Sequence, residues 1–328
     1  MSTLSWAVVT AETDPARAVW TEAARAAAVA GPRFVDWRSV AAGEAGFHAG
    51  ETVFCERLAG WAPTNPVGGQ RARHREFAAA LDQLSAAVDK GGAVLAAGVA
   101  PMLTTLDRLE RDQFLRRGGI PVLERSTADN VGHSILRSRF ASSDDWLIDG
   151  WHTTLFVHRA RTGFEVWRSP AETVTGTEHL KQIVAGLEAD TVYVTETLHR
   201  AHLADDYHDI RFGLVDGKVT HAAGVLRERI VGPRQWYGGR RRELDDFLRR
   251  FGASRWERLV ALAERTAALF PDLRLLGVDL IVDNSEKEFV FDVDPFGADL
   301  PGRRGEAGTL GEGLPVHGAV LRALSASS

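Results

Sequence analysis

The sequence contains little of several features that would assign it to a particular class of protein. Its only cysteine, Cys55, excludes an intramolecular disulfide. No apolar run approaches the ~20 residues that a membrane-spanning helix needs, and residues 1–10 lack the basic and apolar segments of a secretion signal. A net charge of -5 leaves no excess of basic residues for nucleic acid or an anionic membrane surface. We therefore expect a cytoplasmic protein with small-molecule partners, no nucleic acid and no membrane.

Lysine and several signature motifs are also missing or scarce. The only lysines are Lys90, Lys181, Lys218 and Lys287, and arginine supplies the other basic residues. A mechanism that depends on lysine therefore has few residues to use. The sequence has no Gly-x-Ser-x-Gly, Walker, His-Glu-x-x-His or Gly-x-Gly-x-x-Gly motif. Hydrolase, P-loop and dehydrogenase interpretations therefore lack support.

Length and composition indicate a folded chain of two or three lobes. The 328 residues exceed the ~250 to 300 at which a single core stops growing. The content of 45% hydrophobic and 25% charged residues is typical of globular proteins. Disorder, collagen and coiled coil are poor interpretations of such a composition.

The first hundred residues predict an α/β lobe. Helical stretches at residues 15–30 and 70–90 alternate with strand-like runs, which fall at residues 6–10, 33–36, 52–56 and 93–97. This order is typical of an α/β layer with a mainly parallel sheet. We place its boundary near residues 100–105, where a helix over 105–117 leads through Gly118-Gly119 into a second lobe.

The later patterns favour antiparallel pairing. The second lobe is expected to be small and mixed, with strands at 155–158, 164–168 and 191–196 and a helix at 178–187. In the third lobe, Asp216-Gly217 separates strands at 209–215 and 218–227, and this dipeptide favours a two-residue primed turn. The remaining expected elements are a second hairpin and two helices, over residues 240–251 and 255–270.

The second hairpin carries the most informative residues. In 278–282 and 289–293 the apolar residues alternate, so Val278, Leu280 and Val282 share one face, and Phe289, Phe291 and Val293 share another. These faces are expected to point into the core, with Val282 paired to Phe289 and Leu280 to Phe291.

The same register places Asp279 directly opposite Asp292, and Asp294 two residues further along the same face. Because like charges directly opposite each other are destabilising, something cationic should compensate, and Mg²⁺ fits the oxygen ligands. The alternative is a solvated hairpin edge whose acids face water.

These residues resemble a known family. Gly277-Val278-Asp279-Leu280 followed by 291–297, Phe-Asp-Val-Asp-Pro-Phe-Gly, resembles the metal-binding strands of the ATP-grasp superfamily. Leu106-Asp107-Arg108 through Gly119-Ile120-Pro121-Val122 is similar to the helix and Gly-Ile-Pro segment that open that fold's central lobe. Asp209-Ile210-Arg211 is similar to the Asp-x-Arg strand of ligases in the glutathione synthetase group. The nearest relatives that we can suggest form an uncharacterised bacterial ATP-grasp group.

The resemblance implies a three-lobe ATP-grasp fold that combines α/β and α+β architecture. A Rossmann-like pre-ATP-grasp lobe would occupy residues 1–104, the central lobe 105–197, and the C-terminal lobe with the hairpin 198–328. The implied activity is that of a carboxylate-amine ligase, in which ATP activates a carboxylate as an acyl phosphate and an amine then attacks it. The implied cofactors are ATP and Mg²⁺, and the partners are a small-molecule carboxylate and amine, such as amino acids or peptides. A homodimer is compatible with this interpretation.

The resemblance also implies roles for individual residues. Asp279, Asp292 and Asp294 would hold Mg²⁺, although the family's usual Glu and Asn are both aspartate here. Arg211 would neutralise phosphate or orient the acceptor carboxylate, its alternative being an ordinary ion pair with Asp209. Arg227 begins a basic stretch through Arg242 that would face phosphate or an acidic acceptor, the alternative being a solvated face.

The nucleotide cleft would involve residues of the central lobe. Thr195 and Glu196 lie in a segment that resembles the strand near adenine and ribose, where Glu196 would accept from ribose hydroxyls. The family places lysines on central-lobe strands to bind the phosphates, and none of the four lysines matches. Arg159, in the segment Phe156-Val157-His158-Arg159, or Arg137 in another alignment, stands in that place. The missing lysines motivate an alternative function, a nucleotide-binding protein or small-molecule phosphotransferase without ligase turnover.

Two other constellations are weaker candidates. His199, His202, Asp205, Asp206 and His208 crowd one segment, yet their spacing matches no known zinc signature. Cys55 lies in an apolar, strand-like run, and buried free cysteines are usually inert rather than nucleophilic.

Overall fold

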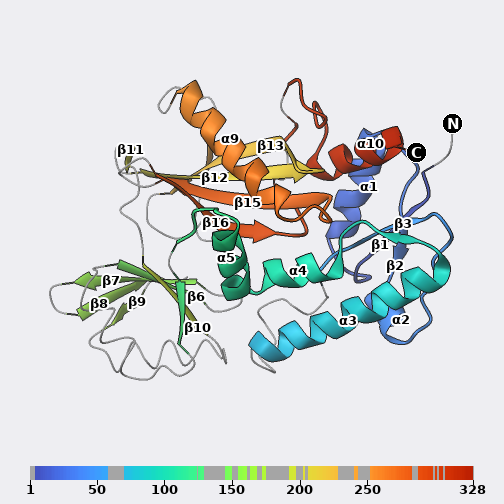
Figure 1. The fold of residues 1–328 in the computed structure, drawn as a ribbon, viewed down its shortest axis with the longest axis horizontal. Coiled ribbons are helices and arrows are strands. Elements are labelled where there is room, and N and C mark those ends of the chain that lie inside the picture. Colours follow the sequence, from blue (N-terminus) through green and yellow to red (C-terminus); the bar gives the residue numbers. More distant parts are fainter. Residues whose placement is uncertain are drawn as a thin grey trace.

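The fold of the chain is shown in Figure 1, a computed structural model. It describes residues 4–57, 70–123, 125–128, 145–149, 154–160, 163–167, 172–174, 192–196, 202–203, 206–227, 240–242, 252–282, 287–297, 300, 303–305 and 307–327. Within residues 70–73, 125–209 and 225–242 only the backbone of these segments is described.

A parallel four-stranded sheet forms the N-terminal lobe. Its strands lie in the order β2-β1-β3-β4, and every neighbouring pair is parallel, as the sequence predicts. The strands are β1 (Trp6–Val9), β2 (Arg33–Val35), β3 (Thr52–Cys55) and β4 (Val94–Leu95). The helices between them are α1 (Ala16–Ala26), α2 (Trp37–Ala41) and α3 (Gln70–Gly91). All the strands expected in this lobe are therefore present.

Both faces of this sheet are buried, as expected for a parallel sheet between helices. Trp6 and Val8 on β1 belong to a cluster with α1 and with the C-terminal helix α10 (Val316–Ser327). Ala7 and Val9 point to the opposite face and join a cluster that includes α3. Figure 1 shows α1 and α10 side by side. The end of the chain therefore returns to complete the core of the first lobe.

Two helices connect the first lobe to the second. The helix expected over 105–117 is in fact interrupted: α4 (Val99–Leu106) ends and α5 (Arg108–Arg117) begins at Asp107. The Asp107 carboxylate accepts hydrogen bonds from the backbone N–H groups of Leu109 and Glu110 at 3.0 Å, a typical N-cap. A single helix was expected because an N-capping aspartate within a helical pattern resembles an ordinary polar surface residue.

The segment after α5 is extended, as its Gly-Ile-Pro sequence predicts. Gly119 adopts a φ of 71°, which ends the helix in the left-handed region that glycine favours. The backbone N–H of Val290 then donates to the carbonyl of Pro121 at 2.8 Å. The connection is therefore bound to the edge of the C-terminal sheet.

The central lobe contains a six-stranded antiparallel sheet in the order β5-β10-β6-β7-β8-β9 (Figure 1). The strands are β5 (Arg125–Ala128), β6 (Asp145–Asp149), β7 (Thr154–Ala160), β8 (Gly163–Trp167), β9 (Glu172–Val174) and β10 (Val192–Glu196). The three strands expected here correspond to β7, β8 and β10, and the helix expected at 178–187 lies outside the described residues.

A second antiparallel sheet forms the C-terminal lobe, in the order β14-β13-β12-β15-β16 with β11 paired to β12. Its strands are β11 (His202–Leu203), β12 (Asp206–Val215), β13 (Lys218–Arg227), β14 (Arg240–Arg242), β15 (Leu275–Val282) and β16 (Glu288–Asp294). Helix α9 (Ala253–Ala268), expected at 255–270, packs on β12, β13 and β15. The φ angles of 46° at Asp216 and 77° at Gly217 confirm the primed turn.

One element of this lobe differs from expectation. A helix was predicted to begin at Arg240, but Arg240–Arg242 form β14 and pair with β13. Helix-favouring arginines were outweighed by the open edge of β13, whose backbone groups need partners. The rest of that predicted helix lies outside the described residues.

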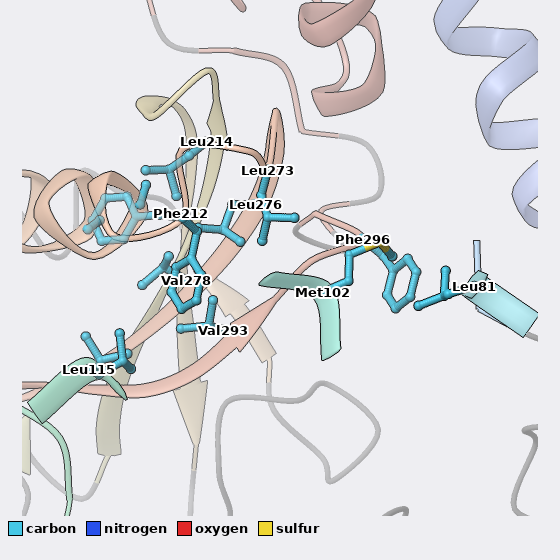
Figure 2. Close-up of a cluster of buried hydrophobic side chains, with 14 of the residues drawn as sticks. Leu81, Met102, Leu115, Phe212, Leu214, Leu273, Leu276, Val278, Val293 and Phe296 are labelled. Carbon is cyan, nitrogen blue, oxygen red and sulfur yellow. The ribbon is translucent and has the colours of Figure 1, made fainter. Parts of the chain in front are cut away.

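A continuous hydrophobic cluster joins the first lobe and the helices α4 and α5 to the C-terminal sheet (Figure 2). Leu81 of α3, Met102 of α4 and Leu115 of α5 belong to the same cluster as residues of the C-terminal sheet. Phe296, just after β16, contacts Phe77 of α3 with ring centroids 6.0 Å apart. The end of the acidic strand is therefore packed against the first lobe. Of the helices described, none is long and apolar enough to cross a membrane.

Candidate active site

The strands β15 and β16, which we call the acidic hairpin, place three aspartates together. Asp279 lies directly opposite Asp292, as the sequence predicts. Asp294, two residues further along β16, pairs with Gly277. The three carboxylates therefore share one end of the hairpin, beside the Pro295-Phe296-Gly297 turn.

Beyond these aspartates the predicted register is wrong. A bulge between Asp279 and Leu280 shifts the pairing, so that Leu280 pairs with Val290 and Val282 with Glu288. The expected pairs of Leu280 with Phe291 and Val282 with Phe289 do not form. Val290 is 2% exposed and takes the core position, whereas Phe289 and Phe291 are half-buried. An extra residue in one strand reverses which side chains face inward, and strict alternation cannot predict it.

Arg211 on β12 compensates the innermost aspartate. Its Nε and Nη2 donate to the two carboxylate oxygens of Asp279 at 2.6 and 2.7 Å, and Arg211 pairs with Asp279 across the two strands. The side chains are 12% and 3% exposed. Burial lowers the pKa of Arg211, but Asp279 and the two further aspartates outweigh it and raise the pKa above its ordinary value. Arg211 therefore forms an ion pair with Asp279, and only the backbone is described for Asp209, the alternative partner.

Arg111 on α5 fulfils the same role for Asp292. Its Nη1 donates to Asp292, while Nε and Nη2 donate to its neighbour Asp112 at 3.1 and 3.0 Å. Arg111 is 1% exposed. Burial again lowers the pKa of the guanidinium, and Asp112 and Asp292 raise it above its usual value. A buried guanidinium therefore fixes α5 to the acidic hairpin.

Arg57 from the first lobe completes the set. It lies two residues after the end of β3, and its Nη2 is 2.5 Å from Asp294 Oδ2. The guanidinium also lies over the ring of Phe296, 5.2 Å from its centroid. Both partners are more exposed than the other two pairs, at 40% for Arg57 and 19% for Asp294. The cationic compensation expected from the sequence therefore comes from one arginine of each of three distant segments.

The donor set suits magnesium in one binding mode. Across the described residues, no group of three or more His, Cys, Asp or Glu side chains is arranged to enclose a metal ion. Mg²⁺ is commonly held by one or two carboxylates together with substrate phosphates rather than by a protein cage. Asp292 and Asp294, which are 12% and 19% exposed, fit that mode. The acidic hairpin can therefore accept Mg²⁺ together with a phosphate ligand.

The other predicted site residues lie where only the backbone, or nothing, is described. Arg159 is on β7, Thr195 and Glu196 are on β10, and Arg227 ends β13 opposite Tyr207. Arg137 lies outside the described residues, as do His199 and Asp205 of the weak zinc candidate. The burial of Cys55, and to a lesser extent the charge of Glu56, raises the pKa of its thiol, as expected of an inert cysteine.

The sequence did not reveal Arg57, Arg111 or Glu56. Glu56 follows β3, accepts a hydrogen bond from the indole N–H of Trp20 at 2.6 Å, and lies 3.9 Å from Nε2 of His317. Burial raises the pKa of Glu56 to about 7, and burial lowers that of His317 to about 4. For Glu56 and Arg57 the one available signal was position, because charged residues at the carboxyl ends of parallel strands often form sites. Arg111, within α5, gave no such signal.

Comparison with known proteins shows which solved structures this chain resembles. No family model and no curated protein sequence matches the chain. The ATP-grasp ligase PsnB, solved with a minimal precursor, aligns over 99% of this chain and 99% of its own, with a TM-score of 0.60 and 17% identity. The D-cycloserine synthetase DcsG aligns over 97% and 99%, with a TM-score of 0.60 and 17% identity. D-alanine–D-alanine ligase from Bacillus anthracis, solved with ATP, aligns over 90% and 87%, with a TM-score of 0.55 and 10% identity.

Three features thus agree: the parallel first lobe, the two antiparallel sheets, and a likeness that extends over nearly the whole chain. At these identities a structural likeness establishes the fold. The chain therefore has the fold of the ATP-grasp superfamily.

Proposed function

We propose that this chain is an ATP-dependent carboxylate-amine ligase, with ATP bound between the central and C-terminal lobes. The γ-phosphoryl group of ATP passes to a carboxylate oxygen, and ADP leaves. The amine then attacks the acyl phosphate, inorganic phosphate leaves, and an amide or peptide bond remains. The ligases named above share the fold, and PsnB has been solved with a precursor, Mg and ADP.

The acidic hairpin is the observation that carries this proposal. A pair of aspartates directly opposite each other is destabilising unless charge compensates it. Three arginines from distant segments provide that compensation while leaving Asp292 and Asp294 partly exposed. An arrangement that serves only stability is more simply built from apolar residues. The retained charges therefore support a site for phosphates and a divalent cation.

Each charged residue has a role in this proposal. Asp292 and Asp294 would hold Mg²⁺ together with the phosphates, whose charge the metal would neutralise when bound. Asp279, the third predicted ligand, has both carboxylate oxygens bound by Arg211 and would join the metal only if Arg211 turned to the substrate. Arg211 already binds a carboxylate through both arms of its fork, and the same geometry suits the acceptor carboxylate or a phosphate oxygen. Arg227, at the end of the neighbouring strand, serves the same substrate.

The nucleotide is bound by residues of the central lobe in this proposal. Arg137 or Arg159 binds the ATP phosphates, and Thr195 and Glu196 of β10 contact the nucleoside.

Calorimetric titration with a non-hydrolysable ATP analogue, with and without Mg²⁺, tests the nucleotide site first. Affinity that increases with Mg²⁺ supports the proposal. ADP release is then screened with amino acids and peptides, because PsnB and a further protein of similar structure, the macrocyclase MdnC, have been solved with precursor peptides. Asp292→Ala should abolish Mg²⁺-dependent ADP formation, while the fold persists because Arg111 keeps Asp112. Asp82→Ala on the exposed face of α3 is the matched control. An unchanged rate in Asp292→Ala would overturn the metal assignment.

A phosphotransferase or nucleotide-binding protein is the second candidate, and the position of the lysines favours it. Lys90 lies in the last turn of α3, Lys218 pairs with Glu264 at the surface, and Lys287 precedes β16. None of these three described lysines is on the central sheet, where a phosphate-binding lysine is expected. ADP formation without an amide product would establish phosphate transfer, and analogue binding without ADP formation would establish a binding protein.

A further inference from the structure

Glu56 occupies a position where ligands bind in open parallel sheets. In the order β2-β1-β3-β4, the chain passes from β1 to one side and then returns to the other, so the strand order reverses between β1 and β3. Ligands bind at the carboxyl ends of strands at such a point. Glu56 directly follows β3, and its backbone N–H donates to the carbonyl of Val9, the last residue of β1, at 2.9 Å. The residue therefore lies at the carboxyl ends of both strands.

The carboxylate of Glu56 differs from those of the acidic hairpin because it forms no ion pair with any arginine whose side chain the structure describes. The indole N–H of Trp20 donates to Oε1 at 2.6 Å, and Nε2 of His317 is 3.9 Å away. Burial keeps His317 neutral near pH 7. Among the side chains that the structure describes, no arginine or lysine lies within ion-pair distance of Glu56, since its neighbour Arg57 pairs with Asp294. A carboxylate that is 14% exposed is thus held by an indole N–H, and Arg57 acts on it only from beyond ion-pair distance.

A small cavity adjoins this carboxylate. Its volume is about 20 Å³, enough for one group of the size of a water molecule or an ammonium head. The rings of Trp20, Phe54 and Phe296 line it with Glu56, and aromatic faces attract cations. Apolar side chains complete the wall, namely Val53, Leu95, Met102 and Leu275. An apolar pocket that contains one fixed acid favours a ligand with one positive charge.

We propose that this Glu56 pocket binds the primary ammonium group of the amine substrate. This inference rests on the proposed ligase function, because the reaction needs an amine held near the activated carboxylate. The bound ammonium group loses one proton before its nitrogen attacks, and the Glu56 carboxylate is the group of the pocket that can accept this proton. Pro295 and Phe296 line the pocket and directly follow Asp294 of the acidic hairpin. The charged groups that act on Glu56 are Arg57, Asp14 and Asp294, so an incoming cation meets more negative than positive charge. The small volume selects a primary ammonium group over a quaternary one.

Methylammonium is the probe for this pocket, and the Trp20 indole N–H signal in a ¹H–¹⁵N NMR spectrum is the readout. Trp20→Phe identifies the signal among the nine tryptophans. We expect a saturable shift with methylammonium, stronger at about pH 8 than at about pH 6 because Glu56 ionises between them. Glu56→Gln should weaken the affinity about 10- to 100-fold, the value of a charged hydrogen bond. Glu22→Gln, on the exposed side of α1, should not change it.

The outcomes separate this pocket from the ligase proposal because the titration contains no nucleotide. An absent shift, an equal shift with tetramethylammonium, or an equal shift in Glu56→Gln overturns the pocket, including the case in which it holds only water. ADP formation without methylammonium binding also overturns it while leaving the ligase proposal intact. Methylammonium binding without amide formation supports an ammonium-binding pocket, but it overturns the ligase and with it the assignment of the pocket to the amine substrate.

Discussion

Arg211 and Asp279 face each other across β12 and β15, joined by two hydrogen bonds at 2.6 and 2.7 Å in a setting where Asp279 is 3% exposed. Removing one partner of such a pair leaves a buried charge without its compensation. The pair therefore contributes to stability as well as to the proposed site, and the two contributions can be measured apart.

Arg211→Met should lower the free energy of unfolding by about 3–5 kcal/mol, because both guanidinium hydrogen bonds to a buried carboxylate are lost. Denaturant unfolding provides the measurement. The double variant Arg211→Met with Asp279→Leu should cost less than the sum of the single variants, since neither charge then remains buried. Lys218→Met is the control, because the Lys218–Glu264 pair is exposed and contributes about 1 kcal/mol or less. A loss in Arg211→Met no larger than in this control would contradict the prediction.

Stability should depend on pH through Glu56 and His317 in opposite directions. The pKa of Glu56 is raised by burial from 4.5 to about 7, so the folded state holds a proton that the unfolded state has released, and stability falls as pH rises through that window. The pKa of His317 is lowered by burial from 6.5 to about 4, so stability falls as pH drops through that window. Each group alone changes the free energy of unfolding by about 1.4 kcal/mol per pH unit.

The two slopes oppose each other where the windows overlap, and variants should separate them. Glu56→Gln should become more stable as pH rises from about 4 to about 6.5. His317→Gln should become less stable as pH rises from about 4.5 to about 7. Denaturant unfolding across this range measures both profiles. If each variant keeps the profile of the parent chain, these two groups do not titrate as their surroundings indicate.

The acidic hairpin shows what the sequence could and could not predict. Alternation and the short loop predicted that Asp279 faces Asp292, because a hairpin register is a local property. The bulge after Asp279 escaped prediction, since an extra residue leaves no mark on the hydrophobic pattern. The arginine partners lie 68, 181 and 237 residues away from their aspartates along the chain. A single sequence carries no information on contacts at such separations, so it predicted the need for positive charge but not its source.

The same contrast applies to the first lobe. The order of strands and helices predicted its parallel sheet, because each element is signalled within a few residues. Glu56 and His317 meet only because α10 returns to the first lobe from the far end of the chain. The pocket beside Glu56 depends on Leu275, Pro295 and Phe296, which also come from the far part of the chain and could not be foreseen from the residues around Glu56.

Gly297 ends the turn that follows Asp294, and its conformation admits only glycine without strain. Its φ is 86°, and a Cβ placed there would lie 2.7 Å from Cγ of Leu275. Gly297→Ala should lower the free energy of unfolding by about 2–4 kcal/mol, because it adds left-handed backbone strain to a steric overlap in the core.

Gly308→Ala is the matched control, since Gly308 has a φ of 77° but a Cβ there would meet no atom within 4 Å. The control should cost about 1–2 kcal/mol, the contribution of the backbone alone. Equal losses in the two variants, measured by denaturant unfolding, would show that Leu275 yields without cost, and the turn beside the Glu56 pocket would then be less tightly packed than the structure indicates.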